Sequence, residues 1–140
     1  MYFGESVQYV EDKFGKSIEN EINRFDESTK RVLYKERFSI KTRIIDEIYQ
    51  FYKDKYNFKI PHKYFSMYFI CNKISVYTIN DNINLSVNCE WEDGKFKSYL
   101  KSSKNISDFN FTAEVVITRR KISKTNNKEI ITVYCRRIHR

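Results

Sequence analysis

The sequence predicts an α+β fold, with two or three N-terminal helices packed on one face of an antiparallel meander sheet of about five strands. Apolar residues recur every three or four positions from Glu5 to Phe25, as in an amphipathic helix. After Pro61, the single proline, apolar and polar residues alternate in several runs, as in strands with one buried face. We therefore expect one domain with a helical part, residues 1–60, and a sheet, residues 64–140.

A second long helix is predicted from Ser39 to about Tyr56, where isoleucines and aromatic residues form one broad apolar face. The segment before it, residues 26–39, fits two structures. Asp26 or Ser28 could cap a short helix, whereas residues 31–38 also alternate in the manner of a strand. The pattern alone leaves both readings open.

The sheet is expected to begin with residues 64–79, which are strand-like with a break near Asn72 and Lys73, followed by a turn at residues 80–82. Residues 83–91 alternate cleanly and lead into Asp93-Gly94, a sequence that favours a two-residue hairpin turn. That turn predicts a hairpin with these cross-strand pairs: Trp91 with Phe96, Glu90 with Lys97, Asn88 with Tyr99, and Val87 with Leu100.

The C-terminal end predicts a second hairpin, with strands Phe109–Lys121 and Glu129–Ile138. Matching of apolar and polar faces places Val115 opposite Cys135 on the core side. The same register places Glu114 opposite Arg136 and Val116 opposite Tyr134 on the other side.

The charge distribution predicts an anionic partner, or a partner that carries charges of both signs. The net charge is +8, but residues 1–29 hold seven acids and three bases, which leaves +12 for residues 30–140. The abundance of Lys, Asn, Ile, Phe and Tyr is typical of an A/T-rich genome. No apolar run is long enough to span a membrane, and no secretory signal is visible. The cysteines Cys71, Cys89 and Cys135 are therefore expected to be reduced in a cytoplasmic protein, or in the host cytoplasm for a phage or viral one.

No pattern of catalytic residues is complete, so we expect neither an enzyme nor a bound cofactor or metal. His62 lies beside the proline and His139 lies next to the last residue, both poor positions for a general base. Cys135 and His139 lack further zinc ligands at a usual spacing. The acids and lysine of residues 90–95 could suggest a metal-dependent nuclease, but cross-strand pairing explains them more simply.

The helices can cover only one face of the sheet, so function is expected on the other, which we call the open face. Basic and aromatic side chains together are typical of surfaces that bind single-stranded nucleic acid. The predicted binding residues for a nucleic acid or nucleotide are Lys97, Tyr99, Lys101, Arg120, Tyr134 and Arg136. The alternative is a phage or viral accessory protein that inhibits a host nucleic-acid-processing or defence complex, as anti-CRISPR proteins do, with its acidic N-terminal helix meeting a basic surface.

Overall fold

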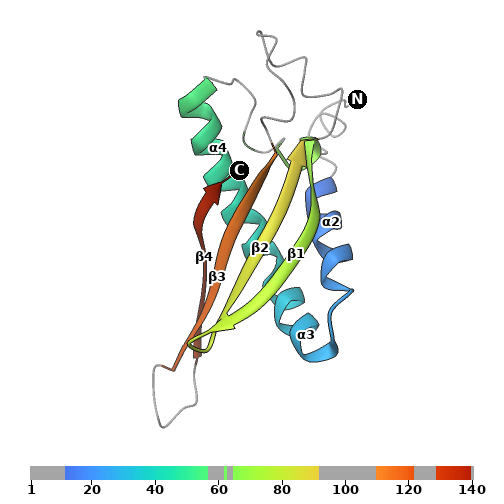
Figure 1. Ribbon diagram of the computed structural model, residues 1–140, viewed down its shortest axis with the longest axis vertical. Coiled ribbons are helices and arrows are strands. Elements are labelled where there is room, and N and C mark those ends of the chain that lie inside the picture. The colour runs from blue at the N-terminus through green and yellow to red at the C-terminus, as the bar shows by residue number, and fades with distance from the viewer. Residues whose placement is uncertain (1–11, 57–61, 63–64, 92–109, 122–128, 140) are drawn as a thin grey trace, which may run out of the picture.

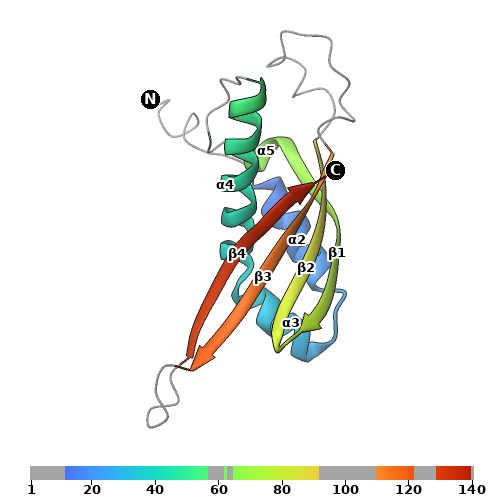
Figure 2. The ribbon, with the colours of Figure 1, turned by 60° about the vertical axis from the view of Figure 1, so that its left-hand side comes forward.

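The structure, a computed structural model, describes residues 12–56, 62, 65–91, 110–121 and 129–139. The helices are α2 (Lys13–Ile22), α3 (Glu27–Lys35), α4 (Arg37–Tyr56) and α5 (Phe65–Tyr68). The strands are β1 (Phe69–Ile79), β2 (Asn82–Trp91), β3 (Phe111–Lys121) and β4 (Glu129–His139). They form one antiparallel sheet in the order β1-β2-β3-β4, with α2, α3 and α4 on one side (Figures 1 and 2). The predicted α+β fold is confirmed, with four strands in the described residues rather than about five.

The segment 26–39 is helical. Asp26 caps α3, since its carboxylate accepts a hydrogen bond from the Thr29 backbone N–H at 2.9 Å. Leu33, which belongs to this helix, is fully buried. The next helix, α4, begins at Arg37, two residues before the predicted start. The side-chain cap and the buried leucine outweigh the weak alternation that had left a strand possible.

No described helix has both the length and the apolar character needed to cross a membrane.

Strand β1 differs from the prediction at its start and contains the expected break. Residues 65–68 form the short helix α5, so the strand begins at Phe69. Its register with β2 shifts between Cys71 and Lys73, which is a β-bulge at Asn72. The shift places Ile74 opposite Val87 in the core, where an unbroken register would have placed Lys73.

The C-terminal hairpin has the predicted register from Val115↔Cys135 to Lys121↔Glu129. It then shifts by one residue. Glu114 lies opposite Arg137, whereas the predicted partner was Arg136. Without this bulge, Arg137 would face the core beside the fully buried Ala113. With it, Ile138 takes that position and packs against the core.

The predicted pairing of β2 with residues 95–100 is wrong at the two positions where the structure describes the neighbours on both sides of β2. Val87 pairs with Ile74 on one side and with Ala113 on the other, and Asn88 pairs with Lys73 and Thr112. Leu100 and Tyr99 therefore cannot be the partners of these two residues. The alternation of β2 matches β3 as well as it matches residues 95–100, so a local turn signal could not decide between them. The Asp93-Gly94 turn itself lies outside the described residues.

The core between helices and sheet is built around the ring of Phe69. Its centroid lies 4.2 Å from that of Phe14 on α2 and 5.2 Å from that of Trp91 on β2. Phe111 on β3 and Phe65 on α5 lie at 6.0 and 6.3 Å. Because one ring contacts four elements, this cluster fixes the helix layer on the sheet.

Both edges of the sheet are tied to helices. On β1, the backbone N–H of Cys71 donates to Ser17 Oγ at 2.8 Å, and that of Ile74 donates to Glu21 Oε1 at 3.2 Å. On β4, Arg43 Nε donates to the Val133 carbonyl oxygen at 3.2 Å. These bonds hold α2 and α4 against the same face, which leaves the other face of the sheet without a helix in the described structure (Figure 2).

Candidate functional site on the open face of the sheet

The open face consists of rows in which the register places one residue of each strand side by side. One row contains Tyr77, Asn84, Val116 and Tyr134. The two tyrosines, on the edge strands, are 39% and 43% exposed, whereas Asn84 and Val116 between them are nearly buried. Asn84 lies on a central strand with Tyr77 directly opposite, so neighbouring side chains shield it. The row therefore presents an aromatic ring at each end.

The next row centres on Glu114, whose carboxylate binds three basic side chains of β4. Arg136 Nη2 lies 2.6 Å from Oε1, while Arg137 Nε lies 2.5 Å and His139 Nε2 2.9 Å from Oε2. Because Arg136 is the bulged residue, it and Arg137 both point to this face. The side chain of Glu114 is only 10% exposed, whereas those of Arg136 and Arg137 are 49% and 62% exposed. The buried carboxylate thus holds two exposed guanidinium groups next to each other.

The electrostatics of this cluster follow from those contacts. The hydrogen bond from Arg137 is the main cause that lowers the pKa of Glu114 to about 2. The pKa of Arg136 is raised, first by its hydrogen bond to Glu114 and to a smaller extent by Tyr77 and Tyr134. Two guanidinium charges face one carboxylate, so an uncompensated positive charge remains. Each guanidinium also keeps N–H donors that Glu114 does not use. An anionic ligand could accept hydrogen bonds from those donors.

We predict that replacing Glu114 by Gln removes part of the acid sensitivity of the fold. The folded pKa is about 2, against 4.5 for a free carboxyl group. The ionised group therefore stabilises the fold above about pH 4.5, and this contribution is lost as the pH falls toward 2. Between about pH 5 and pH 2, the parent should lose more stability in urea unfolding than the Gln variant. Glu27→Gln, at a carboxylate that is 85% exposed, is the control. Equal acid slopes for parent and Glu114→Gln would contradict this account.

Of the six binding residues predicted from sequence, the structure brings Tyr134 and Arg136 together. The backbone of Arg120 pairs with that of Ile130. Arg120 is four residues along β3 from Val116, so it lies about 14 Å from the tyrosine row. Its side chain lies outside the described part of the structure, as do Lys97, Tyr99 and Lys101. A binding role remains a prediction for all six residues.

Sequence reasoning missed Tyr77 and Arg137. Asn80 and Asp81 have φ values of 51° and 67°, which makes them a two-residue turn of the left-handed kind. That turn signal could have fixed the pairing of Tyr77 with Asn84 and so placed Tyr77 on the open face. Arg137 faces Glu114 only because of the bulge in β4. The sequence signal for that bulge is the consecutive pair Arg136-Arg137 followed by the apolar Ile138.

The acids of α2 do not form a free acidic surface. Asp12 pairs with Lys41 at 2.8 Å, Glu19 with Arg37 at 2.9 Å, and Glu21 with Arg24 at 3.2 Å. This part of the helix thus uses its carboxylates to hold the fold. A partner bound through an acidic N-terminal helix remains a prediction that these contacts do not favour.

The described residues contain no group of three or more His, Cys, Asp or Glu side chains that could hold a metal ion. Glu90 belongs to β2, whereas Glu92, Asp93 and Lys95 of the nuclease alternative lie outside the described residues. The three cysteines are free thiols, two of them buried. Burial is the main cause that raises the pKa of Cys71 and Cys135 to about 12, and it raises that of Cys89 as well.

These thiols should therefore react slowly in the native protein. The thiolate is the reactive species, and a pKa of about 12 instead of 9 leaves about a thousandfold less of it at pH 8. We expect iodoacetamide to label all three cysteines readily in denaturant and barely in the native state, with mass spectrometry as the readout. A thiol that is labelled equally fast in both states would contradict a structural role for that cysteine.

The chain matches no protein-family model, no curated protein and no solved structure. Its function therefore has to be inferred from the geometry of the open face and from the charge of the chain.

Proposed function

We propose that the protein binds single-stranded nucleic acid on the open face of its sheet, as a binding protein and not as an enzyme. The observation that carries the proposal is the cluster in which Glu114 holds Arg136 and Arg137 together, one row from the exposed ring of Tyr134. Guanidinium groups bind phosphate with well-defined geometry, and aromatic rings stack on bases. The site thus offers a partner for the phosphate and one for the base of a nucleotide.

The spacing of these groups suits one strand of nucleic acid. Successive rows on one face of a sheet are about 7 Å apart. A phosphate bound by the arginine pair therefore keeps an adjoining base within reach of Tyr134. Tyr77, at the other end of the same row, offers a second ring. Stacking of this kind needs bases whose faces are free, which favours a single strand over a duplex.

The charge of the chain supports the same proposal. The net charge is +8, and the basic excess lies in residues 30–140, which include the whole sheet. Such a field attracts a polyanion over distances longer than individual contacts. Glu114 does not oppose it, because two arginines already compensate that single carboxylate.

Binding should be tested with fluorescently labelled oligo(dT) and oligo(U), with a DNA duplex for comparison, by anisotropy at several salt concentrations. We expect tighter binding of the single strands, with log affinity falling by about 0.7 per log salt for each phosphate neutralised. Tyr134→Ala should weaken binding by about 1–3 kcal/mol and leave the salt slope almost unchanged, since it removes stacking and no charge.

The matched control is Tyr34→Ala. Tyr34 is 45% exposed, close to the 43% of Tyr134, but it belongs to α3 on the helix side of the sheet. Its replacement should leave oligonucleotide affinity unchanged. If the parent binds no oligonucleotide at low salt, the proposal fails. An equal loss in both tyrosine variants would show that the open face is not the site.

A further inference from the structure

We propose that the junction of α3 and α4 is a docking site for an acidic polypeptide segment, separate from the open face. The central residues are Tyr34, Arg37 and Phe38, which we call the junction surface. Phe38 is 60% exposed, more than the other large apolar side chains of the described structure, and Tyr34 is 45% exposed. This inference does not depend on nucleic-acid binding, because it concerns the opposite side of the molecule.

The two exposed rings are held in fixed positions by Arg37. Its guanidinium carbon lies 3.8 Å from the centroid of the Tyr34 ring and 4.4 Å from that of Phe38. Arg37 is itself fixed, because Nε binds Glu19 at 2.9 Å and Nη1 donates to the Tyr34 carbonyl oxygen at 2.8 Å. Rings that are already ordered lose little conformational entropy on binding, which is typical of the anchor residues of interfaces.

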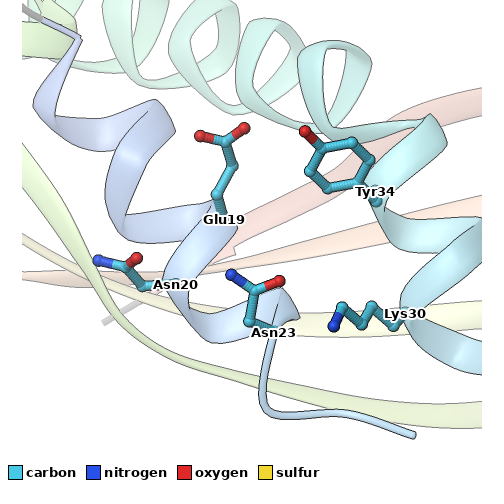
Figure 3. Close-up of a pocket in the computed structure, with 5 residues that line it drawn as sticks. All are labelled: Glu19, Asn20, Asn23, Lys30 and Tyr34. Carbon is cyan, nitrogen blue, oxygen red and sulfur yellow. The ribbon is translucent and has the colours of Figure 1, made fainter. Parts of the chain in front are cut away.

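Two open hollows adjoin these rings. The larger, of about 520 Å³, lies between α2 and α3 and is lined by Glu19, Asn20, Asn23, Lys30 and Tyr34 (Figure 3). The smaller, of about 190 Å³, is lined by Phe38, Ser39, Thr42 and Arg43. Amide and hydroxyl groups can donate to and accept from the backbone of a bound peptide. The junction surface thus offers apolar anchors with polar hollows beside them.

The charge of this region selects an acidic partner. Residues 27–43 contain six Lys or Arg and two Glu. Four of these cations have carboxylate partners. Glu19 and Asp12 bind Arg37 and Lys41 at 2.9 and 2.8 Å, and Glu27 and Asp46 lie 3.9 and 4.0 Å from Lys30 and Arg43. Arg31 and Lys35 are exposed, and neither forms an ion pair with any residue that the structure describes. Acidic side chains of a partner could pair with them, while an apolar side chain covers Phe38.

A nucleic acid fits this surface less well than a polypeptide. Two cations lie over the Phe38 ring, Arg37 at 4.4 Å and Lys41 at 5.6 Å, and both are already bound to carboxylates. Glu19 also lines the larger hollow, where its carboxylate can accept from the backbone N–H groups of a peptide, donors that a sugar–phosphate backbone lacks (Figure 3). A peptide bears both donors and acceptors and can use the carboxylate as well as the asparagines.

The test uses the full chain and a short labelled peptide in which Glu alternates with Phe. We expect binding by anisotropy, and ¹H–¹⁵N NMR shifts confined to residues around 34–42. Phe38→Ser should weaken peptide binding by about tenfold or more while oligonucleotide affinity is unchanged. Because Phe38 is mostly exposed, this variant should keep the fold, which circular dichroism can check. Tyr134→Ala should show the reverse pattern.

Control peptides distinguish specific binding from non-specific adsorption. Replacing Phe by Ser in the peptide should abolish binding, and replacing Glu by Lys should weaken it strongly. The proposal is wrong if the Glu–Phe peptide does not bind, if the Lys–Phe peptide binds equally well, or if Phe38→Ser binds like the parent. Oligonucleotide shifts at residues 34–42 would overturn it too. Self-association that Phe38→Ser abolishes would identify a second copy, and not an acidic peptide, as the occupant.

Discussion

Replacing Arg136 and Arg137 together by Gln should lower the affinity for a single-stranded oligonucleotide by about 10- to 100-fold at low salt. The variant loses the two guanidinium groups that Glu114 holds in place, and charge-assisted hydrogen bonds contribute about 1.5–3 kcal/mol. In contrast to Tyr134→Ala, it should also flatten the salt dependence, because fewer counterions are released.

The matched control for this double variant is Arg24→Gln with Arg31→Gln. Both arginines are exposed on the helix side, so the net charge falls by the same amount away from the site. Equal losses in the two double variants would mean that only total charge matters. Because loss of both arginines leaves the buried Glu114 with only His139 of its three partners, the triple variant with Glu114→Gln is the safer test of folding. Replacing both by Lys should give partial binding, since the charge remains but the planar fork is lost.

Phe69→Ala should lower the free energy of unfolding by about 3–5 kcal/mol, the usual loss for a phenylalanine removed from a core. Phe69 is fully buried and its ring lies among those of Phe14, Phe65, Trp91 and Phe111. Few neighbouring side chains could move to fill the cavity, because rings from α2, α5, β2 and β3 surround it. Urea unfolding followed by fluorescence gives the measurement.

Phe38→Ala provides the comparison for the core variant, since that ring is 60% exposed and should lower stability by less than about 1 kcal/mol. A small loss for Phe69→Ala, similar to that for Phe38→Ala, would contradict the central position of Phe69 in the core.

The register of the C-terminal hairpin could be predicted from sequence because a one-residue slip exchanges its two faces. Val115 opposite Cys135 and Val116 opposite Tyr134 followed from matching apolar with apolar and polar with polar. The helix of residues 39–56 followed in the same way from a continuous apolar face. In each case a long periodic pattern has one arrangement that buries it.

Other features depend on choices that a local pattern does not determine. The partner of β2 could not be predicted, because β3 and residues 95–100 offer similar alternation and only tertiary packing decides between them. The bulges at Asn72 and Arg136 move a basic residue out of the core, so they become visible only when the whole face is considered. The arginine cluster around Glu114 depends on the second bulge, which is why Arg137 was missed.

The most direct test of the central claim is an NMR titration of ¹⁵N-labelled protein with unlabelled oligo(dT) at low salt. We expect the largest shifts at Tyr134, Arg136 and Arg137 and at their β3 neighbours Val116 and Glu114, with Tyr77 also affected. Amides of α3 should not move. Saturable shifts on the open face that diminish with added salt would support binding there. No shifts, or shifts confined to the helices, would contradict it.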